Sequence, residues 1–274
     1  MGSEMCIRDS GEIDTLESIE NVIGSDGDDS IIFTGAAANT VDGGAGDDLI
    51  AGGGGTDILD GGEGNDTNSF EGIGAAVTAS LADGTASYGA VNETFVNFEN
   101  LSGSDNDDNL SGDENANVLT GGLGDDTFTG GAGSDRFVFN DGDNADTVTD
   151  FVVDEDTIEL NDVVADAAAA LALAVDDADG NAVIDLGDGD SIVLTGVSAA
   201  TLTEANFDVQ NSLPTALLSS ESIFTQLSED EPVESSLVSQ GSVSLADSSA
   251  PAEDALVAAQ TAAVVATTDS IEIA

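Results

Sequence analysis

A repeat of nine residues constrains the fold of this chain more than any other feature. Three nonads follow one another from residue 43, GGAGDDLIA, GGGGTDILD and GGEGNDTNS, and each begins G-G-x-G-x-D. Four more nonads run from residue 103 to residue 138. Two degenerate copies, GSDGDDSII and TGAAANTVD, precede the first array and flank one extra residue, Phe33. A fixed period of this kind predicts a solenoid, in which neighbouring coils bury a shared core.

The physical chemistry of one nonad explains its letters. Glycines at positions one, two and four allow positive φ and close backbone approach, which makes a tight turn. The aspartate at position six adds a carboxylate to that turn, and the last three residues form a short strand whose central apolar side chain faces inward. Two nonads then make one coil of eighteen residues, so sixth-position residues eighteen apart stack. The predicted stacked pairs are Asp48 on Asp66, Asp108 on Asp126, Asn117 on Asp135, and Asn39 on Asp57.

The charge of the chain restricts its ligands to cations. It has 56 acidic and two basic residues, a net charge of -54, and no histidine. Two carboxylates 4 Å apart repel by about 1 kcal/mol in water and about four times as much near a protein surface, so the chain needs counterions to compact. Nucleic acids and anionic membrane surfaces are excluded as partners because both are bound through basic clusters. The lone cysteine, Cys6, and the missing histidines leave oxygen-only sites for hard cations such as Ca²⁺.

GGAGDDLIA, GGLGDDTFT and GGAGSDRFV resemble the RTX, or haemolysin-type, calcium-binding repeats. The resemblance implies an all-β, calcium-stapled parallel β-roll, with Ca²⁺ held by the sixth-position residues and their glycine turns. The sixth-position candidates are Asp29, Asn39, Asp48, Asp57, Asp66, Asp108, Asn117, Asp126 and Asp135. The glycine candidates are Gly43, Gly46, Gly52, Gly55, Gly61, Gly64, Gly121, Gly124, Gly130 and Gly133.

Several positions depart from this pattern. Asn39 and Asn117 lack charge, so their sites are expected to be weaker, and TGAAANTVD lacks two glycines. Asn68 stands where an apolar core residue belongs and is expected to end the first roll. An isolated aspartate is more simply a solvated charge or an Asx turn, and glycine richness alone indicates a flexible linker. The fixed offset between glycine, aspartate and apolar residue argues against both alternatives.

The sequence divides into six segments. These are an N-terminal decapeptide (1–10), a first array (11–69), a spacer (70–102), a second array (103–139), a capping segment (140–210) and a tail (211–274). The spacer predicts a β-hairpin turning at Asp83-Gly84 that pairs with or caps a roll end, with a binding loop as the alternative.

The capping segment predicts short strands in DTVTDF and DTIELNDVV, a helix over the alanine-rich residues 162–174, and a hairpin turning near residues 187–189. Residues 176–181 suggest an EF-hand loop, but the twelfth-position glutamate and flanking helices are missing, so a charged turn is favoured.

The two ends differ in composition from the rest. MGSEMCIRDS is typical of a translated adaptor or cloning remnant, in which case the natural protein begins further upstream; the alternative is a genuine terminus. The tail holds all three prolines and no bases, and is expected to be disordered or partly helical. Its acidic and apolar end resembles a type I secretion signal.

These features favour a secreted, extracellular calcium-binding module that folds after export and whose partners are Ca²⁺ and the type I secretion machinery. No apolar run reaches the roughly 18–20 residues of a membrane span, so membrane insertion is not expected. One alternative is a structural piece of an adhesin or surface-layer protein with a cell-surface or matrix partner. Another is part of a secreted hydrolase whose catalytic domain lies upstream. Without histidine, neither H-E-x-x-H nor a histidine-based triad is present, so no enzyme activity is expected in this chain.

Overall fold

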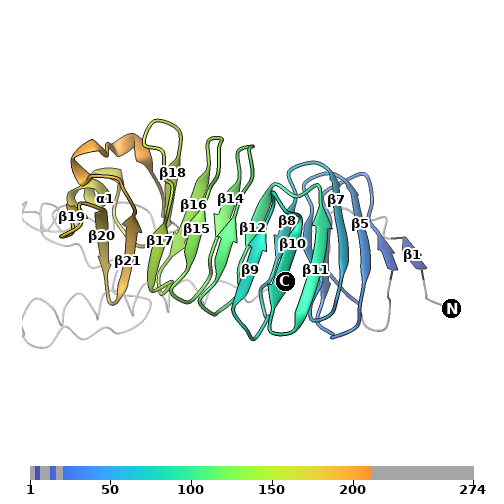
Figure 1. The fold of residues 1–274 in the computed structure, drawn as a ribbon. Coiled ribbons are helices and arrows are strands. Elements are labelled where there is room, and N and C mark those ends of the chain that lie inside the picture. Colours follow the sequence, from blue (N-terminus) through green and yellow to red (C-terminus); the bar gives the residue numbers. More distant parts are fainter. Residues whose placement is uncertain (1–3, 7–12, 17–20, 212–274) are drawn as a thin grey trace, which may run out of the picture. The chain divides into compact units, whose positions relative to one another are not determined.

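The repeats build two facing parallel sheets that share one core (Figure 1). The computed structural model describes residues 4–6, 13–16 and 21–211. In spatial order the larger sheet contains β1 (Glu4–Cys6), β3 (Asn21–Ile23), β5 (Thr40–Ala45), β7 (Ile58–Glu63), β11 (Val91–Val96), β10 (Thr85–Tyr88), β9 (Val77–Ser80), β13 (Asn109–Ser111), β15 (Thr127–Thr129), β17 (Ala145–Val148), β21 (Asp190–Leu194), β20 (Ala182–Gly187) and β19 (Ala174–Asp176). The smaller sheet contains β2 (Ile13–Leu16), β4 (Ser30–Phe33), β6 (Leu49–Ala51), β8 (Thr67–Ser69), β12 (Asn100–Ser102), β14 (Val118–Thr120), β16 (Arg136–Asn140), β18 (Thr157–Asn161) and β22 (Phe207–Gln210).

The register confirms the eighteen-residue coil. In the second array Val118 pairs with Arg136 in the smaller sheet and Asn109 with Thr127 in the larger one. Consecutive nonads therefore alternate between the sheets, and each strand lies beside the strand two nonads later. Strands β13, β14 and β15 are three residues long because a turn interrupts the chain after the x-U-x triplet, whereas β5 and β7 continue through the two glycines that follow.

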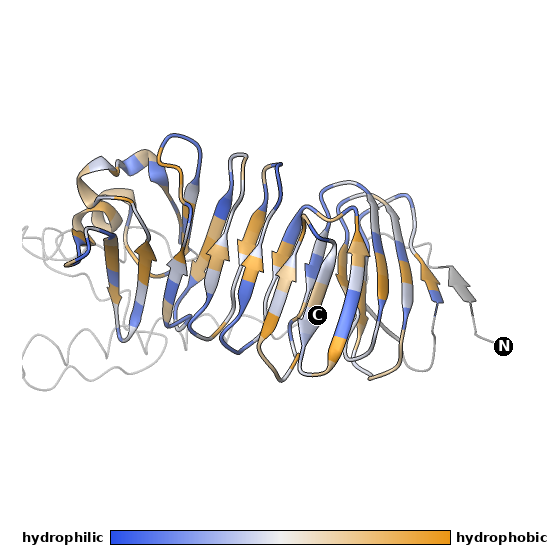
Figure 2. Cartoon of the chain, in the orientation of Figure 1, coloured by the Kyte–Doolittle hydropathy of each residue, from blue (hydrophilic) through white to orange (hydrophobic). Residues whose placement is uncertain are grey.

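The eighth-position side chains form the core. Ile31, Ile50, Leu110, Leu119 and Phe128 are each 0% exposed. Apolar segments accordingly recur in the strands in Figure 2. Full burial of one such side chain contributes about 1.5–3 kcal/mol, so each coil adds a similar increment to the one before it.

The spacer is part of the roll. Strands β9 and β10 form the predicted antiparallel hairpin, and β11, which the sequence did not predict, pairs antiparallel with β10 and parallel with β7. The expectation that Asn68 ends the first roll is wrong, because β8 pairs with β12 and Asn68 aligns with Leu101. The larger sheet thus has three strands where the smaller sheet has one, and aromatic pairs fill the interior at this level, Phe70 with Tyr88 and Phe95 with Phe98.

The C-terminal part of the described chain closes both sheets. β19 and β22 are the edge strands, and helix α1 (Ala167–Leu173) packs against β20 and β22. The helix is shorter than predicted because Asp166 caps its N-terminus, accepting from Ala169 N at 2.8 Å. The hairpin at residues 187–189 is confirmed, and Asp177 lies in the turn between β19 and β20.

Two 3-10 turns, Ala199–Thr201 and Glu204–Asn206, lead into β22. No helix among the described residues is long and apolar enough to cross a membrane. The tail from residue 212 onward, with its expected secretion signal, lies outside the described residues.

Candidate calcium sites

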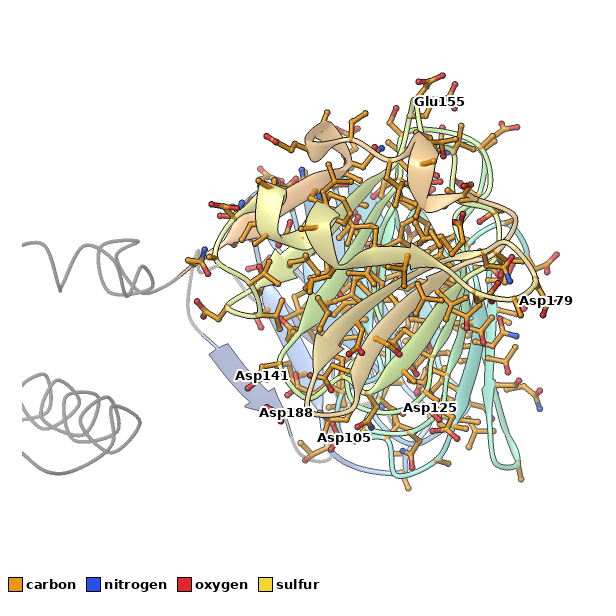
Figure 3. The ribbon with its side chains drawn as sticks, turned by 90° about the vertical axis from the view of Figure 1, so that its left-hand side faces the viewer. Asp105, Asp125, Asp141, Glu155, Asp179 and Asp188 are labelled. Atoms are coloured by element: carbon orange, nitrogen blue, oxygen red, sulfur yellow. The ribbon has the colours of Figure 1, made fainter. Side chains whose placement is uncertain are left out.

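The sixth-position residues form two columns, one along each edge of the roll. The first column lies on turns that lead from the larger to the smaller sheet and contains Asp29, Asp48, Asp66, Asn117 and Asp135. The second column lies on turns that lead back and contains Asn39, Asp57, Asp108 and Asp126. All nine residues are buried, with at most 5% of their surface exposed. Exposed acids lie along the same two edges (Figure 3), with Asp105, Asp125 and Asp141 on one edge and Glu155 on the opposite one.

One hydrogen bond repeats along both columns. The backbone N–H of a sixth-position residue donates to the side-chain oxygen of the residue stacked on it. Its lengths are 2.8 Å from Asp29 to Asp48, 2.8 Å from Asp48 to Asp66, 2.9 Å from Asn117 to Asp135, 2.7 Å from Asn39 to Asp57 and 2.7 Å from Asp108 to Asp126. The predicted stacking is confirmed, and Asp29 also stacks on Asp48 across the inserted Phe33.

The second oxygen of several aspartates has no donor. Asp48, Asp57, Asp66 and Asp126 each have an Oδ2 atom that is buried and finds no hydrogen-bond partner among the described residues. Asp108 differs, because its Oδ2 accepts from Ser104 N at 2.5 Å. A buried acceptor without a donor is rare in folded proteins and points to a missing cation or proton.

The glycine turns bring backbone oxygens to the same places. A Cβ atom on Gly43 would lie 2.3 Å from Asp48 Oδ2 and 2.4 Å from the Gly61 carbonyl oxygen. Only a residue without a side chain leaves room for both oxygens. The carboxylate of one turn and the carbonyl of the next coil therefore converge, and both are ligands that Ca²⁺ prefers.

Burial raises the pKa of the column aspartates. In the first column the pKa rises to about 6 at Asp48 and Asp135. In the second column it rises to about 7 at Asp126. Burial contributes most, and neighbouring carboxylates add to it, while the backbone N–H that each group accepts lowers the pKa. The raised pKa values therefore indicate carboxylates that lack positively charged neighbours.

The donor set fits calcium better than softer metals. Arg136, the only basic residue in the described part, is engaged by Glu159 and Asp208 at 2.5 and 2.9 Å. No group of three or more acidic, cysteine or histidine side chains converges within the described residues. A cation here would take carboxylate oxygens in pairs and complete its shell with backbone carbonyls, as Ca²⁺ can do.

The two asparagines carry their own donors. Asn39 Nδ2 donates to Ala37 O at 3.0 Å and to Gly52 O at 3.2 Å, and Asn117 Nδ2 donates to Glu99 O at 2.9 Å. An amide that donates to the carbonyl oxygens around it competes with a cation for them. This contact gives a structural basis for the expectation of weaker sites at the two asparagines.

Both columns extend beyond the nonads. Asp126 N donates to Asp146 Oδ1 at 2.8 Å, and Asp135 N donates to Asp156 Oδ1 at 3.0 Å. Burial, together with the nearby charge of Asp126, raises the pKa of Asp146 to about 8. The sequence analysis missed Asp146 and Asp156 because their turns lack the G-G-x-G pattern. They also follow Asp126 and Asp135 by 20 and 21 residues instead of 18. A sequence pattern that could have revealed them is the triplet Asp-Thr-apolar, which begins at Asp126, at Asp146 and at Asp156.

At the spacer the protein supplies its own donors. Glu93 is 1% exposed, and its Oε1 accepts from Asn68 Nδ2 at 2.9 Å. The Tyr88 hydroxyl lies 2.8 Å from Gly53 O and 3.2 Å from Glu93 Oε2. Burial raises the pKa of Glu93 to about 7. The amide of Asn68 and the hydroxyl of Tyr88 are thus the protein donors at the Glu93 carboxyl group, while Asp57 Oδ2, on the turn that contains Gly53, still has no donor among the described residues.

Comparison with known families fits this geometry. The profile of the RTX calcium-binding nonapeptide repeat matches residues 33–67 and 102–137, in four copies. The matched residues are RTX calcium-binding nonapeptide repeats. The matched ranges contain eight of the nine sixth-position candidates and leave out Asp29 and the spacer.

Solved structures give more distant likenesses to this chain. The extracellular lipase LipA of Serratia marcescens matches with a TM-score of 0.31 and 18% identity over 70% of this chain and 40% of the lipase. The AlgE6R3 subunit of the Azotobacter vinelandii mannuronan C5-epimerase matches with a TM-score of 0.28 and 21% identity over 68% of this chain and 80% of the subunit. The chain thus spans less than half of the lipase. No curated protein gave a significant match.

Proposed function

We propose that this chain is the secretion and folding module of an extracellular protein, which leaves the cell unfolded and folds outside when it binds Ca²⁺. The observation that carries the proposal is the set of buried aspartate oxygens without donors, most clearly Asp126 Oδ2 and Asp48 Oδ2. Without a cation, these oxygens are buried and unpaired in a chain of net charge -54. Binding an ion that the unfolded chain cannot hold would add its binding free energy to folding.

The proposed ligands are the carboxylates of the sixth-position aspartates and the carbonyl oxygens of their glycine turns. Residues 11–69 and 103–139 would contain the sites, residues 140–210 would cap the roll, and the tail from residue 211 would carry the export signal. Mixed carboxylate and carbonyl shells suit Ca²⁺ better than Mg²⁺, which requires a smaller octahedron and keeps its waters. Filling is expected at about 10⁻⁴–10⁻³ M, the range of extracellular modules.

The calcium affinity links folding to location. Cytosolic free Ca²⁺ lies well below that range, so the chain would remain unfolded inside the cell, in the form that a narrow export channel accepts. Outside, ion binding would close the roll and disfavour return.

A secretion assay in a host with a type I exporter tests the export part of the proposal. The parent chain is compared with a variant that lacks residues 211–274 and with Asp126→Ala. The parent should appear in the medium, the truncated chain should remain in the cell while folding normally in calcium once purified, and Asp126→Ala should be exported but fold less well. Export of the truncated chain at the parent's level would overturn the assignment of the tail.

A further inference from the structure

The C-terminal end of the spacer has a sequence similar to part of a nonad. Residues 99–103 are ENLSG and residues 108–112 are DNLSG, so Glu99 occupies the place of a sixth-position aspartate. Neither match to the RTX profile includes Glu99. In the smaller sheet Asn100 aligns with Thr67, which places Glu99 next to Asp66 in the first column.

Glu99 makes the hydrogen bond that defines the column. Asp66 N donates to Glu99 Oε2 at 2.8 Å, just as Asp48 N donates to Asp66 Oδ1 at 2.8 Å. The first column therefore continues across the spacer by one coil, with a glutamate in place of an aspartate.

The backbone of the spacer supplies the carbonyl that the next glycine turn would provide. A Cβ atom on Gly61 would lie 2.1 Å from the Asn97 carbonyl oxygen and 2.7 Å from Asp66 Oδ2. This arrangement matches the one at Gly43, where the carbonyl belongs to Gly61. Asn97 has a φ of 56°, a left-handed conformation that asparagine tolerates, and its Nδ2 donates to Asp60 Oδ1 at 2.7 Å.

An unsatisfied oxygen points into this junction. Asp66 is 0% exposed and its Oδ2 has no hydrogen-bond partner among the described residues. Burial raises the pKa of Asp66, and the nearby charge of Glu99 raises it further. Two carboxylates and a carbonyl oxygen lie here without a basic residue, and a hard divalent cation is the partner that satisfies such a set.

We propose that Asp66, Glu99 and the Asn97 carbonyl form a calcium site that the repeats alone do not contain and that the spacer completes. The site rests on the proposed function, because it uses the same ion and the same column. Its consequence is specific: calcium would fasten the return of the spacer to the first array, so the two arrays would fold as one unit.

The substitution Glu99→Gln tests the site. Glutamine keeps an acceptor for Asp66 N and removes the charge. The number of calcium ions bound per chain is measured by equilibrium dialysis, together with thermal unfolding in saturating calcium and amide hydrogen exchange of residues 97–102. The variant should bind one ion fewer, unfold at a lower temperature and exchange faster in that segment. The matched control is Glu63→Gln, the same change at an exposed position on β7, which should behave like the parent.

The sign of the stability change separates the site from simple repulsion. If no ion binds here, removing a charge that repels Asp66 should leave calcium-loaded stability equal or higher, and a parent-like ion count with that result would overturn the proposal. A Glu99→Gln chain too unstable to fold in calcium supports it, provided that Glu99→Asp folds; failure of Glu99→Asp as well would replace the site by a packing role. If the parent itself binds no calcium, the proposed function fails, whereas loss of only this site leaves that function standing.

Discussion

The two columns of the roll are built alike within the nonads, and they differ at the spacer. The first column passes from Asp66 to Glu99 with its hydrogen bond intact, while the second is interrupted after Asp57 by three antiparallel strands. Glu93 is aligned with Asp57 through the pairing of Thr94 with Ile58, but its carboxyl bonds to Asn68 and lies beside Tyr88 in the interior.

The difference shows two surroundings for a buried carboxyl group. Asn68 and Tyr88 bring protein donors to the Glu93 carboxyl group. Where no donor among the described residues reaches the second oxygen of a column aspartate, as at Asp48, Asp57 and Asp66, that oxygen is left over. We therefore expect Glu93 to depend on side-chain hydrogen bonds and the column aspartates to depend on the ion.

Acidification is expected to have the largest effect, because it acts on both columns together. Burial raises the pKa of Asp126 to about 7 and of Asp146 to about 8 in the folded chain, against 3.8 for the ordinary side chain. Since the folded carboxyls hold their protons to higher pH, the calcium-free roll is favoured at low pH, fully so below about 3.8, and loses that contribution as pH rises through about 6 to 8.

Circular dichroism in EGTA should accordingly show more β-structure at about pH 5 than at about pH 8, and the calcium midpoint should rise as pH falls, because protons and ions compete. A calcium midpoint that is the same at both pH values would contradict the assignment of these carboxyls as ligands.

Asp126→Asn should weaken one site strongly. The change removes the charge of a buried side chain whose Oδ2 has no donor, and ligand charge is what sets calcium affinity. Loss of roughly tenfold or more in affinity at that site is expected by calorimetry. Asp105→Asn, on the neighbouring turn of the same edge and exposed, is the matched control and should titrate like the parent.

The nonad pattern predicted the repeating part of the fold because each coil has the same local cause. Glycine turns, buried eighth positions and eighteen-residue stacking all follow from one nonad, and all are confirmed. Asn68 was misread because its partner, Glu93, lies 25 residues further along the chain, on a strand that reaches β7 through a long-range pairing. Asp146 and Asp156 were missed because their turns are longer and have different residues, although their Asp-Thr-apolar triplets were readable.

Asn68→Leu should destabilise the calcium-loaded chain although it restores an apolar core position. The change leaves Glu93 Oε1 buried without its amide donor, which costs about 1–3 kcal/mol. Adding Glu93→Leu should recover much of that loss, because replacing a buried polar pair by apolar residues is often neutral. Urea unfolding of the single and double variants in saturating calcium measures both effects. A single variant more stable than the parent would show that the polar pair has no structural role.

Tyr88→Phe should have the smallest effect of the four. It removes the hydroxyl that lies 2.8 Å from Gly53 O, a loss of about 0.5–1.5 kcal/mol in unfolding free energy. Thr85→Val also removes a hydroxyl from β10 but at an exposed position, and should be neutral. Equal unfolding free energies for the two variants would show that the hydrogen bond of the Tyr88 hydroxyl does not stabilise the chain.

Circular dichroism of the whole chain with and without calcium, at about pH 8, tests the central claim most directly. In EGTA the spectrum should lack the β-sheet signature, because the column carboxylates are ionised and unscreened. Addition of Ca²⁺ should restore it with a midpoint at about 10⁻⁴–10⁻³ M, and Mg²⁺ at the same concentration should not. An unchanged β-rich spectrum in EGTA would contradict the account, because it would mean that the roll closes without an ion on its unpaired oxygens.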